Sequence, residues 1–337
     1  MIIVLKPKIA KKEEAAVIRE IRKLGYTPHI MRGVARTVIG AIGDERTHVS
    51  LEPLSTWPQV ESVTPIQKRY KLVSREAHPS NSTVKARDVS IGGRKVQIMA
   101  GPCSVESEKQ LLETAVAVKE AGATILRGGA FKPRTSPYEF QGLGEKGLKL
   151  LAKARKETGL PVITELLSEN HAEMVAEYAD ILQIGTRNAQ NFQLLIAAAK
   201  TGKPVLLKRG MCMKTEEWLL AGEYILAHGN PGLLFCERGI RTFDTYTRNT
   251  LDLAMVPILK SETHLPVVVD PSQGTGKSSL VTAMCKGAIA MGADALLIEV
   301  HPNPAEAWSD GAQQVTLEGF RKLMQDIKPF IAAVGRE

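Results

Sequence analysis

The sequence has little of several features that define other classes of protein. Its four cysteines, Cys103, Cys212, Cys236 and Cys285, lie far apart without a Cys-x-x-Cys pair, so neither a disulfide framework nor a zinc ribbon is predicted. No apolar run reaches the roughly 18 residues of a membrane span, and the N-terminus lacks the pattern of a signal peptide. We therefore expect a cytoplasmic protein with no membrane partner.

Aromatic residues are also scarce, whereas positive charge is in excess. Only 5% of the residues are aromatic, and 44 Lys and Arg against 36 Asp and Glu give a net charge of +8. A hydrophobic content of 44% over 337 residues excludes a disordered chain. The excess charge leaves two interpretations, a surface that binds nucleic acid or pockets that bind small anions.

The first 70 residues predict a small domain of their own. Its elements alternate in the order strand, helix, strand, strand, helix, strand (βαββαβ), which is typical of ferredoxin-like domains. The predicted ranges are 2–5, 13–24, 29–31, 37–42, 49–56 and 60–65. Residues 71–90 begin with a polar segment rich in helix breakers around His78-Pro79-Ser80-Asn81, so we expect them to form a linker.

From residue 91 to 337, eight short apolar runs alternate with amphipathic segments. The runs cover 96–102, 124–130, 161–167, 180–186, 204–210, 233–239, 266–272 and 295–302. Helix candidates include 108–120, 147–158, 216–227 and 279–291, where apolar residues recur at three- and four-residue spacing. Eight such units over about 240 residues favour an α/β fold of the (β/α)8 TIM barrel type over a doubly wound sheet. No GxGxxG motif follows the first strand, which also argues against a dinucleotide fold.

Barrel enzymes build their sites at the carboxyl ends of the strands, and the residues at these ends are strongly charged. They are Cys103, Arg127, Lys132, Arg134, Glu165, Arg187, Lys208, Arg209, Glu237, Arg238, Asp270, Glu299 and His301. Any one cation could pair with a rim carboxylate, but so many at one rim repel one another unless an anion neutralises them. Phosphate fits the fork of Arg and the point charge of Lys. The sequence therefore favours anion pockets over a nucleic-acid surface.

Three potential metal ligands follow the first and last strands of the predicted barrel. Cys103, Glu299 and Asp310 combine a thiol with two carboxylates, a set that suits Zn, Fe or Mn. Each also has an ordinary structural role, as a buried small side chain, an ion-pair partner and a turn residue respectively. Spacing alone favours the turn role for Asp310, which stands in Ser309-Asp310-Gly311.

Seven motifs carry a resemblance to a known family. They are AGPCSVES (100–107), LRGGAFKPRTSPYEFQGLG (126–144), QIGTRNAQNF (183–192), LLKRG (206–210), CERGIRTF (236–243), VDPSQGTGK (269–277) and IEVHPNPAEAWSDGAQ (298–313). In this order they resemble the 3-deoxy-D-arabino-heptulosonate 7-phosphate (DAHP) synthases, and most closely the microbial type I beta class. The resemblance covers nearly the whole chain. It implies the first step of the shikimate pathway to aromatic amino acids, the condensation of phosphoenolpyruvate with erythrose 4-phosphate.

The resemblance also implies roles for the charged residues. Phosphoenolpyruvate would lie among Arg127, Lys132, Arg187, Lys208 and Arg238. The aldose phosphate would meet the KPRTS segment, which is Lys132, Pro133, Arg134, Thr135 and Ser136. Related 3-deoxy-octulosonate 8-phosphate synthases, which use arabinose 5-phosphate, carry a segment of the KANRSS kind here, so KPRTS favours the four-carbon sugar.

One residue departs from the family pattern. The family holds a divalent metal ion (Mn, Fe, Zn or Co) with Cys, His, Glu and Asp, and these positions correspond to Cys103, position 273, Glu299 and Asp310. Position 273 is Gln, where the family reads DPSH. We expect weaker metal binding, with Gln273 or a water as fourth ligand or with little dependence on metal. Because three ligands remain, we still expect a bound divalent ion.

The expected reaction is an aldol-like attack of C3 of phosphoenolpyruvate on the aldehyde, with water adding at C2 and phosphate leaving by C–O cleavage. Lys132, Cys103, Glu299 and Asp310 are the expected catalytic residues. Cationic neighbours of Lys132 would lower its pKa and make it the proton donor, with Glu165 or a metal-bound water as alternatives.

Two alternative functions remain open: a metal-poor barrel that senses aromatic amino acids without chemistry, and a synthase that uses arabinose 5-phosphate. The N-terminal unit resembles the ferredoxin-like regulatory domain of the class, which implies feedback inhibition by Tyr or Phe, with His29 as one candidate for their binding. The family also suggests a homotetramer.

Overall fold

The computed structural model describes residues 1–32, 36–43, 48–64 and 68–337. The chain divides after Arg69, so that Met1–Arg69 and Tyr70–Glu337 form separate units. Within the described ranges, no helix is both long and apolar enough to cross a membrane.

The first unit is an antiparallel sheet with one α-helix on its core side. Its elements are β1 (Ile2–Leu5), α1 (Lys11–Lys23), β2 (Thr27–Arg32), β3 (Thr37–Ile42), a 3-10 helix (Glu52–Thr56) and β4 (Val60–Thr64). The strand order β2-β3-β1-β4 is that of a ferredoxin-like sheet. Val17 and Ile21 of α1 are buried in one cluster with Ile3, Leu5 and Ile39 of the sheet. The predicted fold of this unit is confirmed.

The second predicted helix of this unit, over residues 49–56, is shorter than expected. The structure contains a five-residue 3-10 helix, Glu52–Thr56, in its place. Pro53 lies in its first turn and Pro58 follows two residues after its end. Because proline lacks the N–H that a continuing helix needs, the segment cannot extend into a regular α-helix.

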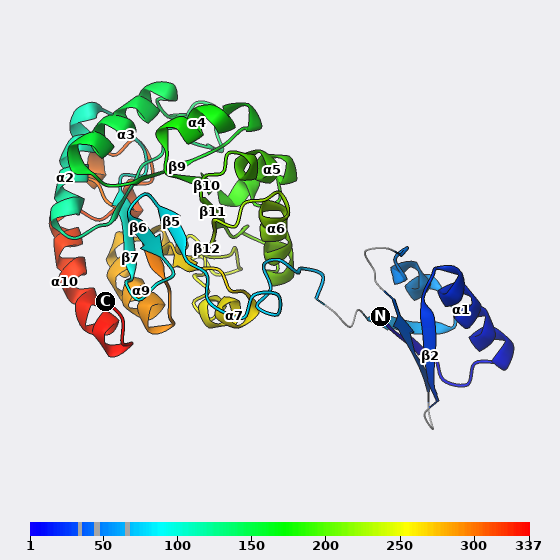
Figure 1. The fold of residues 1–337 in the computed structure, drawn as a ribbon. Coiled ribbons are helices and arrows are strands. Elements are labelled where there is room, and N and C mark those ends of the chain that lie inside the picture. Colours follow the sequence, from blue (N-terminus) through cyan, green and yellow to red (C-terminus); the bar gives the residue numbers. More distant parts are fainter. Residues whose placement is uncertain (33–35, 44–47, 65–67) are drawn as a thin grey trace. The chain divides into compact units, whose positions relative to one another are not determined.

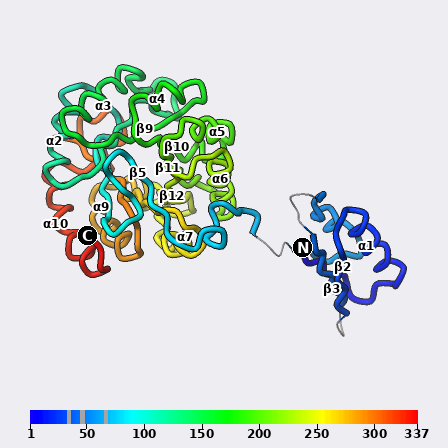
Figure 2. The backbone as a smooth tube through the Cα atoms, in the orientation of Figure 1, coloured from blue at the N-terminus to red at the C-terminus, as the bar shows by residue number. Residues whose placement is uncertain are grey.

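The second unit is a closed barrel of eight parallel strands in the order of the sequence. The strands are β7 (Gln97–Gly101), β8 (Ile125–Arg127), β9 (Val162–Glu165), β10 (Ile181–Ile184), β11 (Val205–Lys208), β12 (Leu233–Glu237), β13 (Val267–Val269) and β14 (Ala295–Glu299). Figures 1 and 2 show the successive strand and helix units following one another around the barrel. The predicted (β/α)8 barrel is confirmed, since each predicted run contains one strand.

Helices surround the strands (Figure 1). They are α2 (Glu108–Glu120), α3 (Glu145–Thr158), α4 (Ala172–Tyr178), α5 (Phe192–Lys200), α6 (Thr215–Ala227), α7 (Met255–Glu262), α8 (Pro271–Thr275), α9 (Ser278–Ala290) and α10 (Leu317–Ala333), with short 3-10 helices at Glu169–His171, Thr186–Asn188, Pro304–Glu306 and Gly311–Gln313. Helix α2 begins where the Ser107 side chain accepts the N–H of Gln110, an N-cap that fixes the predicted start. Helix α10, from the end of the chain, packs beside α2 and closes the ring.

The segment 71–90, for which composition predicts a linker, is instead part of the barrel unit. The carboxylate of Glu223 on α6 accepts the backbone N–H groups of Lys71, Leu72 and Val73 at 2.9, 2.8 and 3.0 Å. The strands β5 (Val84–Ala86) and β6 (Val89–Ile91) then form a hairpin whose buried side chains join those inside the barrel. The linker prediction is therefore wrong, because partners distant in the sequence satisfy the polar backbone of this segment.

Candidate active site

A cavity of about 300 Å³ opens at the carboxyl ends of the barrel strands. Seven of its lining residues are cations: Arg127, Lys132, Arg134, Arg187, Lys208, Arg238 and Arg248. Three carboxylates, those of Glu139, Glu165 and Asp310, also line it. The excess of positive charge in a confined space favours an anionic ligand, as the order of residues along the sequence predicts.

Several of these cations are paired with carboxylates and so held in place. Arg127, at the end of β8, donates to Glu299 at 2.5 Å, and both side chains are buried. Lys208, at the end of β11, donates to Asp270 at 2.6 Å in a similarly buried pair. Such pairs fix the direction of a cation because both partners are excluded from water.

Two cations of the cavity keep unused hydrogen-bonding capacity. Arg187 is exposed at the cavity and makes no hydrogen bond or ion pair with any residue in the described part of the chain. Arg238 is buried, and its Nε has no partner within that part of the chain either. Because Arg187 lines the cavity with its donors unused, its guanidinium is suited to receive the oxygens of an anion.

Three residues expected at the rim have other surroundings. Arg209 donates to Glu237 at 2.9 Å and to Asp252 at 3.1 Å, and neither Arg209 nor Glu237 lines the cavity. His301 lies 3.2 Å from the carboxylate of Glu106 in a buried pair that also stands apart from the cavity lining. These three residues therefore form ion pairs outside the cavity, which is the ordinary structural role that the sequence left open for them.

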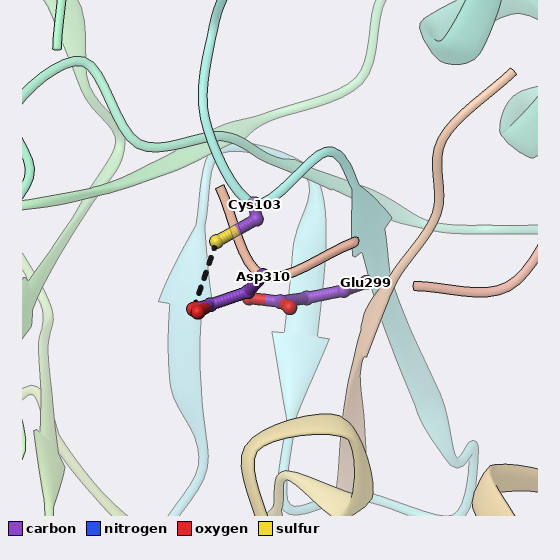
Figure 3. A group of neighbouring side chains, drawn as sticks. All are labelled: Cys103, Glu299 and Asp310. Carbon is purple, nitrogen blue, oxygen red and sulfur yellow. Dashed lines mark hydrogen bonds between the residues drawn. The ribbon is translucent and has the colours of Figure 1, made fainter. Parts of the chain in front are cut away.

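Cys103, Glu299 and Asp310 come together from three different segments. Figure 3 shows their side chains pointing toward one another, with the Cys103 thiol donating to Asp310 Oδ2 at 3.4 Å. One ligand atom from each lies within 4.8 Å of the others. Asp310 has a positive φ of 48°, as expected of a turn residue. Its carboxylate nevertheless joins this group, so Asp310 has a second role besides the turn role that spacing alone favours.

The donor set of this group fits a divalent ion. Ligand atoms that share one ion at about 2.0–2.3 Å lie at most about 4.5 Å apart, which is close to the spacing found. Burial, with a smaller contribution from Glu299, raises the pKa of the Cys103 thiol to about 12. The thiol is therefore protonated at neutral pH until a cation displaces its proton.

Gln273 lies against the same group from the short helix α8. Its Nε2 donates to Glu299 Oε1 at 3.1 Å and to Asp310 Oδ2 at 3.3 Å. Its Oε1 accepts from Arg238 Nη2 at 3.2 Å. The amide thus connects the carboxylates of the group to a cation of the cavity.

Lys132 contacts both the group and the cavity. Its Nζ donates to the carbonyl oxygen of Cys103 at 3.2 Å and to the sulfur at 3.0 Å. Burial lowers the pKa of Lys132, but Cys103, Glu299 and Glu165 together raise it above its usual value. The expectation that cationic neighbours lower this pKa is therefore wrong, since the acidic neighbours outweigh Arg127, and Lys132 is charged at neutral pH.

Glu165, at the end of β9, lines the cavity beside Lys132 and Lys208. Its burial raises the pKa of the carboxyl, an effect that the nearby cations only partly offset. Gly185 lies against it, since a Cβ at that position would be 1.9 Å from Glu165 Oε1 and would force the carboxyl to shift. The carboxyl is thus packed closely and suited to exchange a proton.

Most of the KPRTS segment reaches the cavity. Lys132, Pro133, Arg134 and Thr135 line it, whereas Ser136 is not among the lining residues. Arg134 pairs with Glu139, which accepts from its Nη2 at 3.0 Å. This pair holds the Arg134 guanidinium at the cavity wall.

Two functional neighbours were missed from the sequence. Arg248, in the loop between β12 and α7, donates to Asp310 Oδ1 at 3.2 Å and to Gln313 Oε1 at 3.1 Å. Gln313 Nε2 in turn donates to Glu299 Oε2 at 2.7 Å. Arg248 could not be predicted from the strand ends, because it lies eleven residues beyond Glu237. In the sequence, the charge of this loop was the feature that pointed to it.

Comparison with known proteins accounts for both units. Residues 72–333 match the model of the DAHP synthetase I family, and residues 1–68 match that of the DAHP synthase ferredoxin-like domain. The chain is 50% identical over 335 residues to the phospho-2-dehydro-3-deoxyheptonate aldolase of Thermotoga maritima, with 99% of each chain covered. It is also 34% identical over 278 residues to the 2-dehydro-3-deoxyphosphooctonate aldolase of Caulobacter vibrioides, covering 76% of this chain and 95% of that one.

Solved structures give the same result. The crystal structure of the phospho-2-dehydro-3-deoxyheptonate aldolase (DAHP synthase) of Thermotoga maritima superimposes with a TM-score of 0.96 at 49% identity, covering 100% of this chain and 98% of that one. A truncated form of the 3-deoxy-D-arabino-heptulosonate 7-phosphate synthase of the same organism covers 79% of this chain and 98% of its own, with a TM-score of 0.75 at 50% identity.

Proposed function

Because the chain belongs to the DAHP synthetase I family, we propose that the charged cavity at the rim of its barrel is the active site of a DAHP synthase. This activity condenses phosphoenolpyruvate with erythrose 4-phosphate to DAHP and phosphate, the first step of the shikimate pathway. The observation that supports the location is the meeting, in one cavity, of seven cations with the group Cys103, Glu299 and Asp310. Two phosphorylated substrates need this excess of positive charge.

Phosphoenolpyruvate binds among the cations at the ends of adjacent strands. We assign its phosphate and carboxylate to Arg127, Lys132, Arg187, Lys208 and Arg238. Two observations support this assignment: Arg238 lines the cavity, and the Arg187 guanidinium beside it has no hydrogen-bond partner among the residues that the structure describes. Arg127 and Lys208 are already oriented by carboxylates, so they present fixed positive charge without reorganising when the substrate arrives.

Erythrose 4-phosphate binds at the KPRTS segment. Arg134 and Thr135 lie at the cavity wall, where they can meet the phosphate of the sugar. We assign Ser136 to the same binding site because it belongs to the KPRTS segment, although it does not line the cavity. Although a relative that is a 2-dehydro-3-deoxyphosphooctonate aldolase is 34% identical over 76% of this chain, the KPRTS segment favours the four-carbon sugar over arabinose 5-phosphate.

Cys103, Glu299 and Asp310 would hold a divalent ion (Mn, Fe, Zn or Co), which would polarise the aldehyde oxygen of the sugar. Around that group the chain's own residues position the two substrates and transfer protons to and from them. C3 of phosphoenolpyruvate forms a bond to the aldehyde carbon, water adds at C2, and phosphate leaves as the C2–O bond breaks. Lys132 is charged at neutral pH, so it gives a proton to the former aldehyde oxygen, which thereby becomes the new hydroxyl. Glu165 is the residue suited to take the proton from the water.

The unit Met1–Arg69 regulates the barrel by binding Tyr or Phe, and the protein is a homotetramer in the cytoplasm. The ferredoxin-like domain match supports regulation, and the four free cysteines agree with a reducing compartment. Deletion of residues 1–69, which keeps Tyr70 and the anchored segment after it, should leave activity and abolish inhibition. Inhibition that persists in the truncated protein would contradict the regulatory assignment.

The test of the reaction follows the loss of phosphoenolpyruvate absorbance with each aldose side by side. We expect loss that depends on erythrose 4-phosphate and is much slower with arabinose 5-phosphate. A preference for the five-carbon sugar would contradict the assignment of KPRTS. The absence of turnover with every divalent ion tried would instead favour a barrel that senses aromatic amino acids without chemistry.

A further inference from the structure

We infer that Gln273 is a positioning residue that holds the carboxylates of Glu299 and Asp310 and connects them to Arg238, and that it is not a metal ligand. The inference rests on the proposed function, because it concerns the same group of ligands. It excludes Gln273 as the fourth ligand, which is one of the options that the departure from the DPSH motif leaves open.

The backbone of Gln273 is fixed on both sides. Its N–H donates to Asp270 Oδ1 at 2.8 Å, and its carbonyl oxygen accepts from Asn249 Nδ2 at 2.9 Å. Asp270 is itself held by its pair with Lys208. The side chain therefore starts from a point that cannot shift without breaking these bonds.

The direction of the amide is set by charges of opposite sign at its two ends. Its NH₂ group donates to Glu299 and Asp310, and its oxygen accepts from Arg238. A guanidinium has donors only, and an ionised carboxylate has acceptors only. Turning the amide by 180° would place its oxygen against two carboxylates and its NH₂ against a guanidinium, so all three hydrogen bonds would be lost. The network assigns the orientation without ambiguity.

This orientation determines what Gln273 can contribute. An amide ligates a metal ion through its oxygen, and that oxygen faces Arg238 rather than the group of Cys103, Glu299 and Asp310. The group therefore offers three protein donors. The same amide is hydrogen-bonded to Arg238, which we assign to phosphoenolpyruvate, and to the two carboxylates, so it fixes their positions relative to one another. Gln273 is thus an outer-shell partner of the ligands, a type of contact that orients them.

Cobalt(II) alone is the probe that tests this inference. Metal-free full-length protein is titrated with Co²⁺ while the thiolate-to-cobalt and visible bands are recorded, for the wild type and for Gln273→Leu, with Gln273→Ala as a second variant if leucine prevents folding. Gln313→Leu is the matched control, because Gln313 also donates an amide N–H to Glu299. Cys103→Ser reports the thiolate band.

We expect Gln273→Leu and Gln313→Leu each to weaken Co²⁺ binding by roughly 10- to 100-fold, and the bands of the saturated proteins to match those of the wild type. Gln273→His should change the bands, since an imidazole adds a fourth protein donor. Bands that change in Gln273→Leu but not in Gln313→Leu would overturn the inference, because they would mark Gln273 as a ligand. Unchanged affinity in Gln273→Leu would also overturn it.

The failure of the proposed metal site would look different. Wild-type protein that binds no stoichiometric Co²⁺, or a thiolate band that persists in Cys103→Ser, would refute the site itself and the inference with it. A wild type that binds Co²⁺ through Cys103, combined with altered bands in Gln273→Leu, would refute the inference alone.

Discussion

Two arginines in neighbouring parts of the barrel rim should respond to substitution in opposite ways. Arg187 lines the cavity without a partner in the described chain, whereas Arg209 is buried between Glu237 and Asp252 and does not line it. If the cavity binds phosphoenolpyruvate, Arg187→Ala should impair catalysis and leave stability nearly unchanged. Arg209→Met should impair stability and leave the catalytic constants of the folded enzyme close to those of the wild type.

The magnitudes follow from the two environments. A hydrogen bond to a charged group contributes about 1.5–3 kcal/mol, which is roughly a 10- to 150-fold change in kcat/KM. Because Arg187 is exposed and solvent ions screen its charge, we expect a loss of about tenfold. Breaking a buried ion pair costs about 3–5 kcal/mol, and Arg209→Met leaves Glu237 buried without its main partner.

The assay combines steady-state kinetics for phosphoenolpyruvate with the unfolding midpoint of each variant. Arg187→Ala should raise KM more than it lowers kcat, since the contact is present before the reaction. The reasoning would be refuted if Arg187→Ala kept the wild-type kcat/KM, or if Arg209→Met lost activity without losing stability.

Three further predictions concern Glu165, Gly185 and Glu223. Burial raises the pKa of Glu165, so its contribution to stability is present below the unfolded pKa of about 4.3 and is lost as pH rises through the folded pKa. The Glu165→Gln variant should therefore melt at a higher temperature than the wild type at pH 7 but not at pH 4. Equal melting temperatures of variant and wild type at both pH values would contradict the raised pKa. Gly185→Ala places a Cβ 1.9 Å from Glu165 Oε1, and the displaced carboxyl should lower kcat/KM by roughly 100-fold; wild-type kinetics would show that the position of Glu165 does not matter. Glu223→Gln weakens the bonds to three backbone N–H groups, so limited proteolysis within residues 71–83 should be faster at unchanged kcat, and an equal cleavage rate would show that the anchor is unimportant.

The barrel was predictable because its local signals agree with one another. Residues 108–120 were predicted and found as a helix, since Ser107 caps its start and Gly122 follows its end with a positive φ. Parallel strands buried on both faces appear as continuous apolar runs, so each run contained a strand. The polar residues after these runs then met at one rim because the strands share one direction.

The features that were missed depend on distant partners. Residues 71–73 resemble a linker by composition, and the carboxylate that anchors them lies about 150 residues away on α6. Arg248 enters the cavity from a loop whose path no periodicity describes. The raised pKa of Lys132 results from Cys103, Glu299 and Glu165 acting together, and the balance of such charges requires their distances. Local pattern cannot supply these three facts.

The central claim is that the cavity among these cations binds phosphoenolpyruvate. The most direct measurement is a crystal structure of the full-length protein soaked with phosphoenolpyruvate. We predict density in the cavity, with anionic oxygens within hydrogen-bond distance of the guanidinium groups of Arg187 and Arg238, both of which line it. Density for the substrate elsewhere on the barrel, with this cavity holding solvent alone, would contradict the claim.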